Sequence, residues 1–261
     1  ISYAATLTLP TPGATNSLAA NKALVIDQLY PNITGVTLAT NNASIAVTFN
    51  EAVFNTANNT GALEASDFSL SISGGTATLS SATPTSISAS GNVYTLGIAS
   101  YSGSPDGSEV LSVVPVDDGI YDGAGNEAST TQTNNTATLN DELPPTISSV
   151  VVAGDNGTVA VTLSEAVFNT INGSGAMEAS NFSLSVAGGT AALSSATPSS
   201  ISASGNVYTL GLPITGAPDG TEILSVVPID NKIYDAVGNE ASTTQSTNTD
   251  TLFDKAAPSI L

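Results

Sequence analysis

The chain has 261 residues, with 22 Asp or Glu against 3 Lys or Arg, so its formal net charge is -19. Binding to nucleic acid or to anionic membranes requires clustered Lys and Arg, and this charge therefore argues against both partners. The absence of Cys and His excludes disulfides, Ser-His-Asp or Cys-His catalysis and the common zinc sites. No stretch approaches the roughly 20 apolar residues of a membrane span, so we expect no membrane insertion.

Alternating apolar and polar residues predict short β-strands along the chain. In the first half, such runs occupy 44–49, 68–72, 92–98 and 110–114. Period-two alternation marks half-buried strands, and Gly, Asn and Pro between the runs mark turns. No segment has convincing helical periodicity. The pattern predicts an all-β fold of tandem immunoglobulin-like antiparallel β-sandwiches, with roughly seven strands in each.

A long internal repeat sets the domain organisation. The stretch EAVFNT at Glu51 returns as EAVFNT at Glu165, and IYDGAGNEASTTQ returns as IYDAVGNEASTTQ. The junction sequences around Asp27, Asp141 and Asp254 also align with one another. These junctions predict two whole repeats, 28–141 and 142–254. We expect 1–27 to hold the C-terminal strands of a preceding repeat and 255–261 to start a following one. Nothing near Ile1 resembles a signal peptide, so we expect an excised or matured fragment.

The topology of a sandwich predicts where the acidic residues gather. The junction, the end of the second strand and the loop between the last two strands should meet at one pole of each repeat. In the first repeat these segments carry Asp27, Glu51, Asp117, Asp118 and Asp122, with Glu127 as a further candidate. In the second they carry Asp141, Glu165, Asp230, Asp235 and Glu240. Asp106 and Glu109 lie at the opposite pole of the first repeat, which we expect to face the second repeat's acidic cluster.

So many carboxylates cannot be balanced by the few Lys and Arg present. Close like charges raise one another's pKa or bind a cation. Calcium takes 6–8 oxygen ligands in adaptable geometry, which suits Gly-rich acidic loops. We therefore predict calcium at the junctions, with the residues named above as candidate ligands. The alternative is that these are ordinary solvated turn residues, since Asp-Gly and Asn-Gly favour turns. An EF-hand pattern is absent.

Two motifs carry a resemblance to a known family. The segment from Val47 to Val53, VTFNEAV, and the turn from Asp122 to Asn126, DGAGN, resemble the bacterial Ig-like repeats of large surface adhesins and S-layer-type proteins. LSEAV and DAVGN provide the counterparts in the second repeat. The Asp-x-x-x-Pro junction is similar to cadherin linkers, which hold calcium between domains, although the fuller cadherin D-x-N-D-N run is missing. The resemblance implies an extracellular, cell-surface location.

Three functions remain open at this point. The first is a non-enzymatic spacer or stalk of an adhesin, rigidified by calcium, whose partners are its neighbouring repeats. The second is a subunit of a self-assembling filament or surface layer, in which the stretch 1–27, including 1–9, completes a neighbour's open sheet edge. The alternative for this stretch is an ordinary late strand of the preceding repeat. The third is a module that binds carbohydrate or protein on a cell surface through the variable loop around Tyr101 or Pro213. We expect no enzyme activity, because the chain lacks catalytic His and Cys and has no Trp for a sugar platform.

Overall fold

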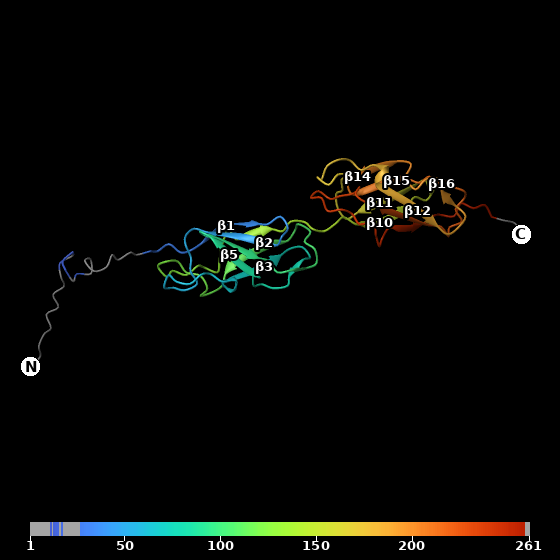
Figure 1. Cartoon of the computed structure of the whole chain (residues 1–261). Helices are drawn as coiled ribbons and strands as arrows, with labels where there is room; N and C mark the ends of the chain where they lie inside the picture. Colours follow the sequence, from blue (N-terminus) through green and yellow to red (C-terminus); the bar gives the residue numbers. More distant parts are fainter. Residues whose placement is uncertain (1–10, 12, 16, 18–26, 259–261) are drawn as a thin grey trace, which may run out of the picture. The chain divides into compact units, whose positions relative to one another are not determined.

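The computed structural model describes residues 11, 13–15, 17 and 27–258. The chain divides into two compact units, Ile1–Asn140 and Asp141–Leu261 (Figure 1). The strands predicted within 1–27 lie almost entirely outside the described residues. In the part of the chain that is described, no helix is long and apolar enough to cross a membrane.

The first unit is built from two antiparallel sheets. The larger sheet has the order β1 (Ile33–Leu38), β2 (Ser44–Phe49), β6 (Val93–Gly97) and β5 (Ser86–Ser90). The smaller sheet has the order β3 (Phe68–Ser73), β8 (Val110–Pro115) and β9 (Thr136–Thr138). A short ribbon joins β4 (Thr78–Leu79) to β7 (Tyr101–Ser102), and the 3-10 helix η1 (Ala65–Asp67) precedes β3.

The second unit repeats this arrangement. Its larger sheet has the order β10 (Ile147–Val152), β11 (Thr158–Leu163), β15 (Val207–Gly211) and β14 (Ile201–Ser204). Its smaller sheet has the order β12 (Phe182–Ala187), β17 (Ile223–Pro228) and β18 (Thr249–Thr251). The ribbon pairs β13 (Ala192–Leu193) with β16 (Ile214–Thr215), and η2 (Ala179–Asn181) precedes β12.

The strand order is that of an immunoglobulin-like sandwich. If the sheet strands of one unit are lettered A to G along the chain, the larger sheet reads A-B-E-D and the smaller reads C-F-G. This is the arrangement of the constant-type immunoglobulin domain. Every pairing within these sheets is antiparallel. The predicted all-β fold of tandem antiparallel sandwiches is therefore confirmed.

The alternating strands bury one face of each sheet. In β2, Ile45, Val47 and Phe49 are buried while the residues between them are partly exposed. Phe49 packs edge-on against Tyr94, with ring centroids 5.9 Å apart, and both contact Phe68 from the opposite sheet. Removing such aromatic and aliphatic surface from water is the main stabilising term of each unit.

Candidate metal centre

Two loops meet at the pole of the first unit where the chain enters β1. Phe54, in the connection between β2 and β3, exchanges backbone hydrogen bonds with Tyr121, in the loop between β8 and β9, at 2.7 and 2.8 Å. Because Glu51 lies three residues before Phe54 and Asp122 directly follows Tyr121, this backbone bridge brings the two acidic residues to one place.

Asp122 is fixed by the turn that follows it. Its side chain is fully buried, and Oδ1 accepts hydrogen bonds from the backbone N–H groups of Ala124 and Asn126, both at 2.8 Å. Oδ2 accepts a third bond from Nδ2 of Asn126 at 2.7 Å. Burial alone would raise the pKa of Asp122, but these hydrogen bonds and that from Gly125 outweigh it and lower the pKa. Asp122 therefore remains a carboxylate.

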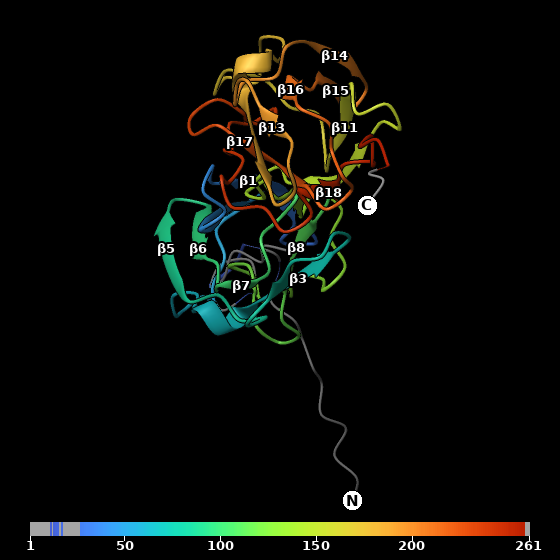
Figure 2. The same cartoon turned by 90° about the vertical axis from the view of Figure 1, so that its right-hand side faces the viewer.

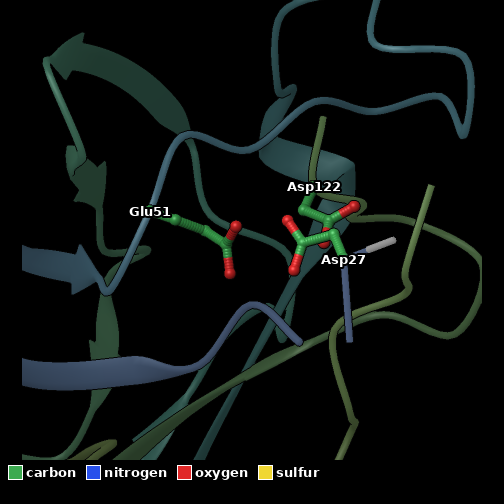
Figure 3. A group of neighbouring side chains, drawn as sticks. All are labelled: Asp27, Glu51 and Asp122. Atoms are coloured by element: carbon green, nitrogen blue, oxygen red, sulfur yellow. The ribbon is translucent and has the colours of Figure 1, made fainter. Parts of the chain in front are cut away.

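Asp27 and Glu51 complete a group of three carboxylates with Asp122. One carboxylate oxygen of each lies within 4.8 Å of those of the other two, and Figure 3 shows the carboxylates of Glu51 and Asp27 facing each other with Asp122 beside Asp27. The segment that carries Asp27 is held in place because Nδ2 of Asn126 lies 3.3 Å from the backbone oxygens of both Asp27 and Leu29.

The pKa of Glu51 is raised by burial and by its two neighbouring carboxylates. Burial is the largest cause of its raised pKa, and the negative charges of Asp122 and Asp27 raise it further, against a hydrogen bond from Asn50 that lowers it. A carboxyl group whose pKa is raised by like charges gains most from a bound cation, because the cation removes the repulsion.

The second unit builds the same group from equivalent residues. Asp141, Glu165 and Asp235 each place a carboxylate oxygen within 4.8 Å of the other two. Asp235 is fully buried, and its Oδ1 accepts bonds from the N–H groups of Val237 at 2.9 Å and Asn239 at 2.8 Å. Nδ2 of Asn239 also donates to the backbone oxygen of Asp141 at 3.2 Å.

The donor set fits a hard divalent cation. Two ligands on opposite sides of a calcium ion, each about 2.3–2.6 Å from it, are about 4.6–5.2 Å apart, so oxygens within 4.8 Å of one another can share one ion. The set is all oxygen, and the chain has no His or Cys, which favours calcium or magnesium over zinc or copper. In the first unit, Asp27 and Glu51 line an open pocket of about 530 Å³ together with Phe54, Asn59 and their neighbours.

Several other acidic residues named as candidates lie outside these two groups. Asp117, Asp118 and Asp230 are exposed. Oδ1 of Asp118 accepts a bond from the Tyr121 hydroxyl at 3.1 Å. Glu240 accepts a bond from the backbone N–H of Asn231, and Glu127 accepts the equivalent bond from Asp118 at 2.6 Å. Glu127 and Glu240 thus brace the loop rather than joining the carboxylate groups.

Glu109 and Asp106 belong to a different structure. Glu109 is fully buried, and its Oε1 accepts bonds from the N–H groups of Thr76 at 3.0 Å and Ala77 at 2.9 Å, while Oε2 accepts one from Asp106 at 3.0 Å. Glu222 makes the equivalent bonds in the second unit to Thr190, Ala191 and Asp219. The oxygens of Glu109 are occupied by main-chain donors, so the structure gives it a role in holding loops together.

Sequence reasoning left out the asparagines that organise each centre. Asn126 and Asn239 hydrogen-bond to the buried aspartate and to the backbone of the entering segment in the same way. The sequence does mark these asparagines, because each is the last residue of a D-x-x-G-N turn. The intervening Gly125 has φ +91°, and a Cβ there would lie 2.7 Å from the backbone oxygen of Ala57, so the turn requires glycine at that position.

No protein-family model matches the chain. No curated protein matches it either. Among solved structures, the N-terminal part of the bacterial S-layer protein SbsC aligns with 78% of this chain and 42% of its own length, at 19% identity and a TM-score of 0.32. A longer piece of SbsC aligns with 82% of this chain and 26% of its own length, also at 19% identity and a TM-score of 0.32.

The titin domains Z1Z2 in complex with telethonin align with 89% of this chain and 100% of their own length, at 14% identity and a TM-score of 0.24. The chain spans less than half the length of the two SbsC structures described above. At these TM-scores the likeness carries no functional conclusion, and the immunoglobulin-like fold follows from the strand order of each unit.

Proposed function

We propose that the chain is a non-enzymatic structural spacer of a long bacterial cell-surface protein, and that calcium bound at the two carboxylate groups stiffens the connection between its repeats. The observation that carries the proposal is the recurrence of one group of three carboxylates, with the same buried aspartate and the same bracing asparagine, in both units. A site that recurs with every repeat suits a structural role, because each repeat needs the same connection to the segment before it.

The position of the first aspartate in each group supports a role in rigidity. Asp27 and Asp141 belong to the segments that lead into β1 and β10, whereas the other two ligands of each group belong to the body of the unit. Asp141 is also the first residue of the second unit. A cation shared by Asp141, Glu165 and Asp235 ties the connecting segment to the sandwich and so restricts the backbone freedom between the repeats.

The test compares solution scattering of the chain in calcium and in EDTA. We expect calcium to narrow the distribution of shapes and Asp141→Ala to remove this effect, while both sandwiches stay folded. Asp254→Ala is the matched control, because Asp254 occupies the aligned position of the last junction and, among the described residues, belongs to neither carboxylate group. Identical profiles in calcium and EDTA, or an Asp141→Ala variant as rigid as the parent, would refute the proposal.

A further inference from the structure

The larger sheet of each unit ends in a strand whose outer side is open. Among the described residues, β5 pairs only with β6 and β14 only with β15. Four of the five residues of β5 are exposed, and Figure 2 shows β5 at the outer margin of the first unit with β6 beside it. An edge strand of this kind presents N–H and C=O groups that can pair with another strand.

The hairpin register identifies the free backbone groups. The two-residue turn of Gly91 and Asn92 joins Ser90 to Val93, which are register partners, and such a turn is closed by a hydrogen-bonded pair. Since hydrogen-bonded and non-hydrogen-bonded pairs alternate along an antiparallel ladder, Ile87 and Ala89 direct their backbone groups away from β6. In the second unit the same register assigns this orientation to Ile201 and Ala203.

The other edges of the two main sheets are covered. β1 lies beside β9, and β10 beside β18. On β10, the backbone N–H of Val152 donates to Oδ2 of Asp250 at 2.8 Å. On the outer side of β3, the N–H of Leu70 donates to the oxygen of Ala82 at 2.7 Å, and on β12 Leu184 donates to Ala196 at the same distance. Within the described residues, β5 and β14 receive no such cover.

The charge distribution selects a partner. The chain carries a net charge of -19, yet 68–105 and 179–218, which contain β5 and β14, have no charged residue at all. Proteins usually protect open edges with Lys, Pro or an inward charge, and the sequence SISAS, at 86–90 and again at 200–204, contains none of these. Two acidic copies repel each other across most of their surface, and they can approach most closely along this uncharged edge.

We infer that β5 pairs edge to edge with β5 of a second copy of this chain, and that β14 pairs in the same way with β14 of another copy. Antiparallel pairing about a two-fold axis at Ser88 sets Ile87 of one copy opposite Ala89 of the other, so that both outward pairs of N–H and C=O groups are satisfied. The pairing joins two four-stranded sheets into one continuous sheet.

Each contact is small, so a single pairing is weak and repulsion between the copies decides whether it forms. The Debye length falls from about 30 Å at 0.01 M salt to about 3 Å at 1 M. Association should therefore strengthen as salt increases, whereas an interface built on ion pairs weakens.

The test is sedimentation equilibrium of the whole chain in EDTA, at about 0.01 M and about 0.5 M NaCl. We expect measurable self-association at the higher salt. Ser88→Lys with Ser202→Lys places like charges opposite each other at the pairing axis and should weaken association at least about tenfold. Thr133→Lys with Ser246→Lys adds the same charge at exposed positions away from these edges and should leave association unchanged or stronger.

A second pair of substitutions tests the backbone directly. Ala89→Pro with Ala203→Pro removes outward N–H groups and none that bonds to the neighbouring strand, so the fold should persist while association falls. A monomer under all conditions would overturn the inference. So would equal association of the lysine or proline edge variants and the parent, because pairing would then use another surface or another partner.

Discussion

Calcium should raise the melting temperature of the chain by about 10 °C when the free ion exceeds its dissociation constant roughly 100-fold. Binding to the folded state alone stabilises it by about 2.7 kcal/mol under that condition, and 1 kcal/mol shifts the melting temperature of a domain of this size by roughly 4 °C or more. The binding geometry exists only in the folded chain, because Asp27, Glu51 and Asp122 are far apart in the sequence and the fold brings them together at one pole. Calorimetric melting in calcium and in EDTA measures the shift.

Glu51→Gln and Glu165→Gln separate the role of the cation from that of the side chain. In EDTA, Glu51→Gln should be at least as stable as the parent, because it removes a carboxylate that Asp122 and Asp27 repel. In calcium the same variant should be less stable, because it has lost a charged ligand. A parent chain whose melting temperature does not respond to calcium would contradict this prediction.

Replacing Glu222 with Ala should lower the melting temperature of the second unit by roughly 10 °C or more, because it leaves one buried and two partly buried main-chain donors without their acceptor. Those donors are the N–H groups of Thr190, Ala191 and Asp219. Desolvation raises the pKa of Glu222, but the backbone hydrogen bonds to its carboxylate outweigh this effect and lower the pKa from 4.5 to about 2. Asp155→Ala, which removes one charge from an exposed turn, is the control and should have a small effect.

The lowered pKa of Glu222 also determines how the folding stability changes with pH. Because the folded-state pKa of about 2 lies below the ordinary value of 4.5, the Glu222 carboxylate contributes its full stability above pH 4.5. That contribution is lost as the pH falls from 4.5 toward 2. Acid titration followed by circular dichroism measures the loss of folding stability as the pH falls from 4.5 toward 2. Relative to each protein's stability at neutral pH, this loss should be smaller in Glu222→Ala than in the parent. Parallel curves would contradict the assignment.

The sequence was sufficient to predict the fold class because alternation of apolar and polar residues determines which face of a strand is buried. The run predicted at 44–49 is β2 to the residue, and 110–114 lies within β8. The 3-10 turns η1 and η2 and the ribbon strands were not predicted. They span only two or three residues each, which is too short for a periodic pattern to be recognised.

The acidic centre could be predicted only in part, because the role of a carboxylate depends on the donors around it. Asp27, Glu51 and Asp122 were grouped by topology, and the structure brings them together. Topology places Glu109 at the opposite pole as a further candidate ligand, yet its carboxylate is enclosed by loop N–H groups near Gly74 and Gly75. No local pattern reveals that main-chain donors from separate loops converge on one side chain.

Calcium titration of EDTA-stripped protein by isothermal calorimetry tests the central claim most directly. Because the described residues of each unit hold one group of three carboxylates, we predict two calcium ions bound per chain, one in Glu51→Gln, one in Glu165→Gln and none in the double variant. Absence of binding to the parent, or a stoichiometry that both substitutions leave unchanged, would contradict the account.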